Sequence, residues 1–171
     1  MKSKLLFLFL VFTQIICAQT FTEVSTVLSL NGVKQSSIAF SDINNDGSED
    51  VLITGKNNSD QDIAKLFTND GMGNFTEMTD TVIGGVSLSS VAFADVNGDG
   101  SEDVIIIGGS GTGADYRTAK LYTNDGTGNF TEMMDTPFTP ARSGSLAFSD
   151  VNGDGSEDVL LTGSDGTSDR L

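Results

Sequence analysis

Three copies of one nine-residue acidic sequence limit the folds that are open to this chain. The sequence is DINNDGSED at residues 42–50 and DVNGDGSED at residues 95–103 and 150–158. Each copy places carboxylate or amide oxygens at positions 1, 3, 5 and 9 and a glycine at position 6. Alternate residues of a tight loop can present such oxygens to one hard cation, such as calcium. The copies begin 53 and 55 residues apart, so the loop belongs to a repeated structural unit.

The segments on both sides of the acidic sequence repeat with it. A short apolar strand is predicted before each copy, and a β-rich run is predicted after it, at residues 51–54, 104–107 and 159–162. A third strand follows in two repeats, AKLFTN at 64–69 and AKLYTN at 119–124, and each ends in a glycine-rich hairpin turn. The unit is therefore four short strands in about 54 residues, and the acidic loop joins the first two. We place the repeats at about 20–73, 74–128 and 129–171, the last one incomplete.

The strands after the acidic loops predict the fold class. Their apolar residues are consecutive rather than alternating, which is typical of strands that are buried on both faces. Four-stranded sheets buried on both faces and repeated at this period indicate an all-β fold of antiparallel blades in an incomplete β-propeller. Since a closed propeller usually has about four to eight blades, we expect either missing C-terminal blades or self-association.

Other calcium-loop proteins differ from this chain after position 9 of the loop. An EF-hand needs a bidentate glutamate at position 12 and a helix on each side. Position 12 is Ile53, Ile106 or Leu161 here, inside a predicted strand, which excludes EF-hand and dockerin modules. Thrombospondin-type repeats are closely spaced and contain cysteines, whereas the repeats of this chain are about 54 residues apart and contain none.

The whole pattern resembles the FG-GAP repeats of integrin α-chain propellers, and most closely the bacterial VCBS and FG-GAP-like repeats. The resemblance depends on the loop D-x-N-x-D-G-x-x-D, the Ala-Phe strand before it, the Val-rich run that ends in glycine after it, and the N-D-G-x-G-N-F turns. It covers essentially all of residues 20–163. It implies calcium-binding blades that serve as a binding, adhesion or structural scaffold, with one structural Ca²⁺ in each loop.

The resemblance also assigns the ligands of about three calcium ions. Side chains at positions 1, 3, 5 and 9 bind the ion, and the serine at position 7 offers its backbone carbonyl. The glutamates at position 8 lie on the outward side and stay solvated: Glu49, Glu102 and Glu157. The implied ligand sets are Asp42, Asn44, Asp46, Ser48 and Asp50; Asp95, Asn97, Asp99, Ser101 and Asp103; and Asp150, Asn152, Asp154, Ser156 and Asp158.

The N-terminal residues 1–18 have the pattern of a secretory signal peptide. Lys2 and Lys4 precede an apolar run that ends at Ile16, and cleavage is expected after Ala18. The run is shorter than the roughly 20 apolar residues that span a bilayer, so we expect no membrane insertion after cleavage. A lipid anchor on Cys17 is disfavoured because the bulky Ile16 precedes it. The repeat region, residues 19–171, is therefore expected to be secreted, extracellular or at the cell surface.

Composition excludes several functional classes. The formal net charge is −15, and the three loops hold half of the 24 acidic residues, so nucleic acid is not an expected partner. The chain has no histidine and its one cysteine lies in the signal peptide, which excludes Cys/His zinc sites. The expected partner is a protein or a glycan of unknown identity.

The alternative is that the chain is a non-catalytic or catalytic propeller part of a larger secreted polysaccharide-active enzyme. Its candidate bases form no recognisable catalytic constellation in the sequence. They are Lys65, Tyr116, Arg117, Lys120 and Tyr122. We therefore expect no catalysis by this chain.

Overall fold

The structure is a computed structural model that describes residues 32–111, 116–166 and 169–170. The predicted signal peptide, its cleavage site after Ala18 and the beginning of the first repeat, residues 20–31, lie outside the described residues. Among the described residues, no helix is long and apolar enough to cross a membrane.

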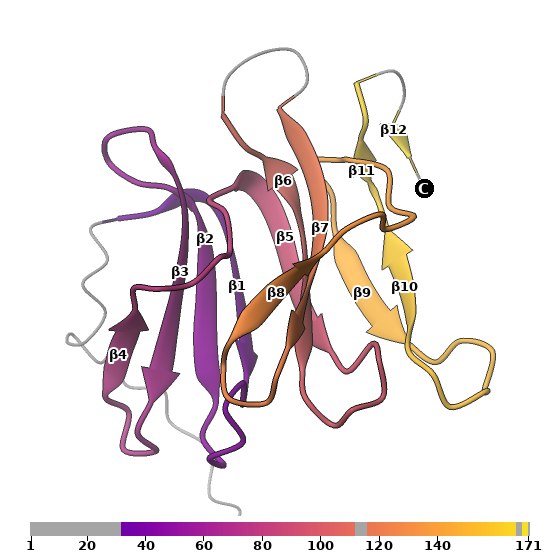
Figure 1. The fold of residues 1–171 in the computed structure, drawn as a ribbon. Helices are drawn as coiled ribbons and strands as arrows, with labels where there is room; N and C mark the ends of the chain where they lie inside the picture. The colour runs from indigo at the N-terminus through magenta and orange to yellow at the C-terminus, as the bar shows by residue number, and fades with distance from the viewer. Residues whose placement is uncertain (1–31, 112–115, 167–168, 171) are drawn as a thin grey trace, which may run out of the picture.

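Two four-stranded antiparallel sheets have the same plan, in which each strand pairs with the next along the chain (Figure 1). The first sheet, which we call blade 1, contains β1 (Lys34–Ser41), β2 (Asp50–Lys56), β3 (Asp62–Asn69) and β4 (Phe75–Met78). Blade 2 contains β5 (Ser87–Ala94), β6 (Asp103–Gly109), β7 (Arg117–Asn124) and β8 (Phe130–Met133). The predicted all-β fold of four-stranded antiparallel blades is confirmed.

The third copy of the repeat forms a shorter hairpin, β9 (Leu146–Ser149) with β10 (Asp158–Leu161), which we call blade 3. A separate two-stranded sheet, β11 (Gly163–Ser164) with β12 (Asp169–Arg170), follows it. In each blade the acidic loop joins the first two strands, and its last residue pairs with the end of the strand before it: Ser41 with Asp50, Ala94 with Asp103, and Ser149 with Asp158. The strands at Phe75 and Phe130 close blades 1 and 2, so each blade is offset by one strand from the repeats read along the sequence.

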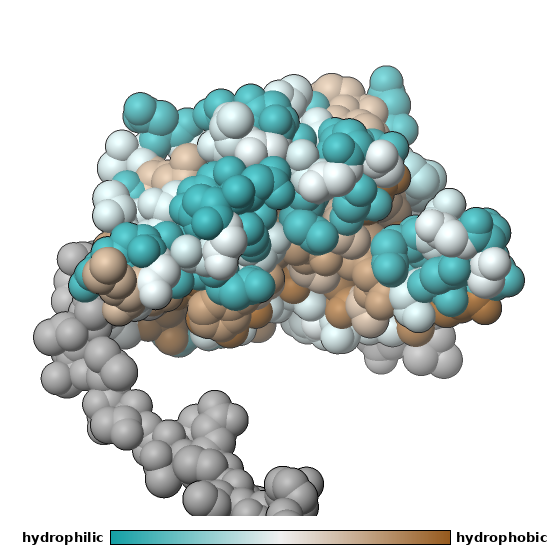
Figure 2. Space-filling model, turned by 90° about the horizontal axis from the view of Figure 1, so that it is seen from below, coloured by the Kyte–Doolittle hydropathy of each residue, from teal (hydrophilic) through white to brown (hydrophobic). Residues whose placement is uncertain are grey.

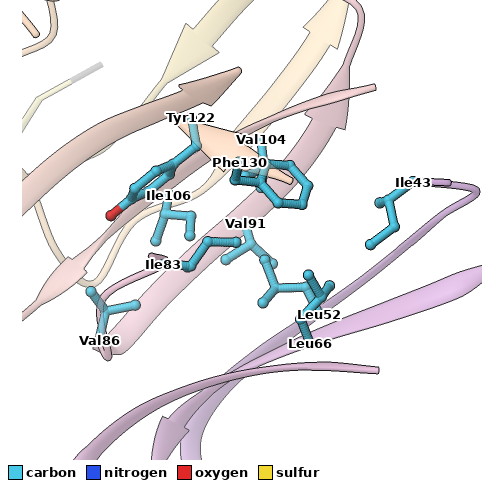
Figure 3. Packing of buried hydrophobic residues seen from close by; sticks show 10 residues of the cluster. All are labelled: Ile43, Leu52, Leu66, Ile83, Val86, Val91, Val104, Ile106, Tyr122 and Phe130. Carbon is cyan, nitrogen blue, oxygen red and sulfur yellow. The ribbon is translucent and has the colours of Figure 1, made fainter. Parts of the chain in front are cut away.

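The blades lie side by side, with their acidic loops at the same end (Figure 1). The core between blades 1 and 2 contains Leu52 and Leu66 from one sheet and Val104, Ile106 and Tyr122 from the other (Figure 3). Burial of branched apolar side chains of this kind contributes roughly 1.5 to 3 kcal/mol each. Packing between the sheets therefore contributes several kcal/mol to the stability of this fold.

The opposite face of blade 2 packs against blade 3. Ile105 and Ile107 alternate with Val104 and Ile106 along β6, and they form a second core with Leu146. All four residues of this run are buried, as their consecutive apolar pattern predicted. Blade 2 is thus covered on both faces because successive side chains of a strand point to opposite sides.

Candidate metal centre

The three acidic loops fold in the same way, and position 1 organises each of them. In the first loop the carboxylate of Asp42 accepts the backbone N–H of Asp46 at 3.0 Å and that of Gly47 at 2.8 Å. The side-chain oxygen of Asn44 accepts the same N–H of Asp46 at 3.0 Å. Oxygens at positions 1 and 3 therefore converge on one nitrogen. The same bonds recur from Asp99 and Gly100 to Asp95, from Asp99 to Asn97, from Asp154 and Gly155 to Asp150, and from Asp154 to Asn152.

Position 5 closes the turn toward position 7. Asp46 accepts the N–H of Ser48 at 2.9 Å, and the side-chain amide of Asn44 donates to its other oxygen at 2.9 Å. The hydrogen bond from Asn44, followed by that from the backbone of Ser48, lowers the pKa of Asp46. The pKa values of Asp99 and Asp154 are lowered chiefly by the backbone N–H groups of Ser101 and Ser156. The carboxylates at position 5 are thus held in their ionised form.

The glycine at position 6 is required by backbone conformation. Its φ is +87° at Gly47, +86° at Gly100 and +89° at Gly155, in the left-handed region that L-residues resist. A Cβ placed on any of the three would meet no atom within 4 Å. Glycine is therefore favoured at position 6 by the positive φ of the backbone, and not by a steric clash between a Cβ and neighbouring atoms.

Position 9 lies at the start of the second strand and is buried in blades 1 and 2. Asp50 accepts the N–H of Ile43 at 3.2 Å and the N–H of Asn69, at the end of β3, at 2.8 Å. Burial raises the pKa of Asp50, and the nearby charges of Asp46 and Asp42 act in the same direction.

Asp103 has the same surroundings in blade 2. It accepts the N–H groups of Val96 at 3.2 Å and Asn124 at 2.8 Å. Its pKa is also raised, mainly by burial. Asp158 in blade 3 is half-buried and keeps the bond from the N–H of Val151 at 3.1 Å.

The structure thus brings together some of the predicted calcium ligands, but not all of them. Positions 1, 3 and 5 surround one turn, whereas position 9 is anchored by backbone N–H groups beside it. The described residues contain no group of three or more aspartate, glutamate, histidine or cysteine side chains arranged to hold a metal ion. The assigned ligand sets therefore remain predictions.

The donor chemistry of the loops fits calcium. Every polar group at positions 1, 3, 5, 7 and 9 offers oxygen, and a hard cation such as Ca²⁺ takes several oxygen ligands. A carboxylate oxygen has two lone pairs, so one that accepts an N–H can still bind a cation. When bound, the ion would supply positive charge to a loop that carries several carboxylates.

Sequence analysis missed the part played by the asparagine that ends the third strand. Asn69 and Asn124 give their backbone N–H to the position-9 aspartate, and their side-chain oxygens accept two N–H groups of the following turn. Their side-chain amides donate to the backbone carbonyls of Glu49 and Glu102, at 3.1 and 3.2 Å. The repetition of Asn-Asp-Gly at both sites was the available signal.

The loops and turns make up the end of the molecule seen in Figure 2, where hydrophilic residues cover much of the surface. Phe40 and Phe93 line a pocket of about 400 Å³ between the first two loops, together with Glu49 and Glu102. Burial raises the pKa of Glu102, and the charges of the neighbouring acids, Asp95 foremost, raise it further. Glu102 is thus half-buried beside other loop acids, whereas Glu49 and Glu157 are exposed, as expected for all three.

The candidate bases have structural partners. Lys65 and Lys120 form cross-strand ion pairs with Glu77 and Glu132, at 2.8 and 2.9 Å. Tyr122 is buried, and its hydroxyl accepts the N–H of Gly84 at 3.3 Å. The guanidinium of Arg142 lies 4.3 Å from the centre of the Tyr116 ring.

The fold and the loops define a class, namely repeat proteins whose β-propeller-type blades carry an acidic loop between their first two strands. The family of the FG-GAP-like repeat matches residues 42–106 and 103–161. The chain belongs to this family, as its resemblance predicted. No curated protein and no solved structure matches the chain significantly.

Proposed function

We propose that this chain is a secreted calcium-binding module in which calcium stabilises the blades and the blades serve as a binding or adhesion scaffold. The observation that supports calcium most strongly is the burial of Asp50 and Asp103 beside further carboxylates. Buried carboxylates of like charge destabilise a fold unless a cation or hydrogen bonds compensate them. Two backbone N–H groups already donate to each of these aspartates, so calcium would offset the remaining repulsion from the carboxylates at positions 1 and 5.

The expected size of the effect follows from mass action. Extracellular calcium modules bind at roughly 0.1 to 1 mM. At free calcium about tenfold above the dissociation constant, each site adds about 1.4 kcal/mol, and three sites add about 4 kcal/mol. That is a substantial share of the roughly 5 to 15 kcal/mol by which a domain is stable.

Isothermal titration and thermal melting test the calcium role. We expect about three ions to bind and the melting temperature to rise by several degrees from chelator to millimolar calcium. Glu102→Gln is the matched control, because it removes a neighbouring acid that the ligand assignment leaves out. The proposal is wrong if the melting temperature is the same in chelator and in millimolar calcium, or if Glu102→Gln alone abolishes calcium binding.

The scaffold role is supported by membership of the FG-GAP-like family and by the structural partners of the candidate bases. A glycan array and a lyase assay on acidic polysaccharides separate it from the enzyme alternative. Binding of one class of glycan on the array, with no cleavage of polysaccharide in the lyase assay, supports the scaffold role. Release of unsaturated products by the purified chain contradicts it.

A further inference from the structure

We propose that the pocket between the acidic loops of blades 1 and 2 binds an alkylammonium group, carried by a free amine or by a lysine side chain of a protein. We call this pocket of about 400 Å³ the inter-loop pocket. Its size lies in the range of pockets that hold small organic ligands. The inference names a ligand class for the scaffold role proposed above and in that sense rests on it, but it does not depend on calcium.

Two carboxylates line the inter-loop pocket, one from each blade. They belong to Glu49 and Glu102, which occupy position 8 of their loops and are left out of the predicted calcium ligand sets. Neither carboxylate forms an ion pair within the described part of the chain. The lysines of that part pair with other acids: Lys34 with Asp60, Lys56 with Asp62, Lys65 with Glu77 and Lys120 with Glu132. The pocket therefore has two negative charges that a cationic ligand would neutralise.

A buried serine hydroxyl is the second observation that points to a ligand. Ser41, the last residue of β1, is 6% exposed and lines the pocket, and its hydroxyl oxygen has no hydrogen-bond partner among the described residues. Side chains alternate along a strand, so Ser41 lies on the same face as Ala39, which packs against the core between blades 1 and 2. The hydroxyl thus points into the space between these blades. A buried hydroxyl without a partner is unfavourable and uncommon, which a ligand at this place would explain.

The polar groups of the pocket match the donors of an ammonium group. A protonated primary amine has three N–H donors and no acceptor. The pocket offers the carboxylates of Glu49 and Glu102 and the hydroxyl oxygen of Ser41, all of which accept hydrogen bonds. Bonds between an ionised donor and a carboxylate are about twice as strong as neutral ones. The head group of the ligand would therefore satisfy the two charges and the hydroxyl together.

Aromatic side chains form the apolar part of the pocket. Phe40 of β1 and Phe93 of β5 both line it; Phe40 is 56% exposed, and Phe93 is half-buried. Phenylalanine carbons pack against the methylene groups of an alkyl chain, and the face of the ring attracts a cation. A bare metal ion is much smaller than the pocket and gains nothing from apolar walls. The lining thus favours an organic cation.

A second pocket, between the loops of blades 2 and 3, is an internal comparison. It also has a volume of about 400 Å³, and Glu157 takes the place of Glu49. Ala94 stands where the inter-loop pocket has Ser41. The second pocket therefore lacks the hydroxyl acceptor, and we expect it to bind an ammonium group more weakly.

NMR titration of the full chain with pentylamine, in millimolar calcium and at low salt, tests the proposal. We expect saturable binding that shifts the backbone signals of Ser41 and Phe93 and weakens as salt is added. Pentyltrimethylammonium has the same chain and charge but no N–H donor. It should bind at least about tenfold more weakly, because it cannot donate to the pocket acceptors. Equal affinity of the two compounds would show general attraction to a negative protein and would overturn the proposal.

Three substitutions separate the pocket from the overall charge. Ser41→Ala and Glu49→Gln should each raise the dissociation constant of pentylamine by about tenfold. Glu157→Gln removes the same charge from the same loop position outside the inter-loop pocket, and it should change the constant by less than about twofold. Ser41→Ala removes a hydroxyl that has no partner in the protein, so this variant should melt no lower than the unchanged chain. A lower melting temperature with unchanged binding would mean that Ser41 is structural, and the proposal would be wrong.

The source of the ammonium group is identified by two further ligands. Tighter binding of cadaverine than of a capped Gly-Lys-Gly peptide indicates a free amine, and the reverse order indicates a lysine side chain of a protein. The proposal is overturned if no amine binds in calcium, or if amines bind only in chelator and thus replace calcium in the loops. It is also overturned if Glu157→Gln weakens binding as much as Glu49→Gln. The melting test of calcium and the glycan array are read separately, so their outcomes are distinguishable from this one.

Discussion

The side-chain amide of Asn124 donates a hydrogen bond to the backbone carbonyl of Ile43, 2.8 Å away and 81 residues earlier in the chain. The same amide donates to the carbonyl of Glu102 at 3.2 Å, and Asn124 is buried. The end of β7 is therefore tied at once to its own acidic loop and to the loop of the previous blade. The loops are part of the contact between blades, so their order and the packing of the blades depend on each other.

Replacing Asn124 should destabilise the fold more than replacing its equivalent in blade 1. Asn124→Ala leaves two carbonyls without their donor in a buried setting, which costs about 1 to 3 kcal/mol. Asn69→Ala removes a bond to one carbonyl at a more exposed place and should cost less. Urea unfolding of both variants measures the difference, and equal losses would contradict this account.

The position-9 aspartate should matter for calcium more than its neighbour at position 8. Asp103→Asn removes a predicted ligand and puts an amide next to two backbone donors, Val96 and Asn124. We expect the variant to bind about two calcium ions instead of three. We expect it to differ less from the unchanged protein in chelator than in calcium, because the amide weakens a backbone N–H bond but also removes a buried charge whose pKa is raised by burial.

Calorimetric titration, and melting in chelator and in calcium, check these two expectations. The matched variant Glu102→Gln should keep the calcium stoichiometry unchanged. Full stoichiometry in Asp103→Asn would remove Asp103 from the ligand set.

The strands and loops of the blades could be predicted from the sequence because short stretches of neighbouring residues determine them. The run from Val104 to Ile107 is apolar at every residue, and the structure buries all four. Each loop also has a glycine at position 6, and in the structure Gly100 has a φ of +86°, in the left-handed region that glycine adopts readily. Patterns of this kind are set within a few residues of the chain.

The contacts between blades could not be predicted in the same way. Ile43 and Val151 occupy the same loop position, yet Ile43 is completely buried and Val151 is 79% exposed. The difference comes from the neighbouring blade, whose turn residue Gly128 approaches Ile43. The repeated sequence predicts the same strands and loop for each blade, but it does not predict which residues of another blade pack against them.

Gly100→Ala should destabilise the protein through backbone strain alone. A Cβ at this site has open space around it, but φ is +86°, and an L-residue in this region costs about 1 to 2 kcal/mol. Asparagine tolerates the region better than alanine, so Gly100→Asn should cost less. Unfolding in chelator isolates the backbone effect from calcium binding. A loss from asparagine as large as that from alanine would point to a cause other than φ.

Asp125, in the turn after β7, should titrate well below an ordinary aspartate. The hydroxyl of Thr127 donates to its carboxylate at 2.6 Å, and the bonds from Thr127 and Asn129 lower its pKa to about 2. Because the folded pKa lies below the unfolded value, the ionised turn contributes stability above about pH 4, and that contribution is lost as the pH falls through about 2. NMR titration of the side-chain carboxyl in chelator measures the folded value directly.

Exchanging the two turns tests the cause of this shift. Methionine stands at position 72 of the blade 1 turn where blade 2 has Thr127, and the pKa of Asp70 there is lowered chiefly by Asn74. Thr127→Met removes the hydroxyl bond and should raise the pKa of Asp125 toward that of an ordinary aspartate. Met72→Thr supplies the hydroxyl and should lower the pKa of Asp70 further. If neither value moves, the hydroxyl does not hold the carboxylate in solution, and the acid stability of the turn depends on its backbone N–H donors.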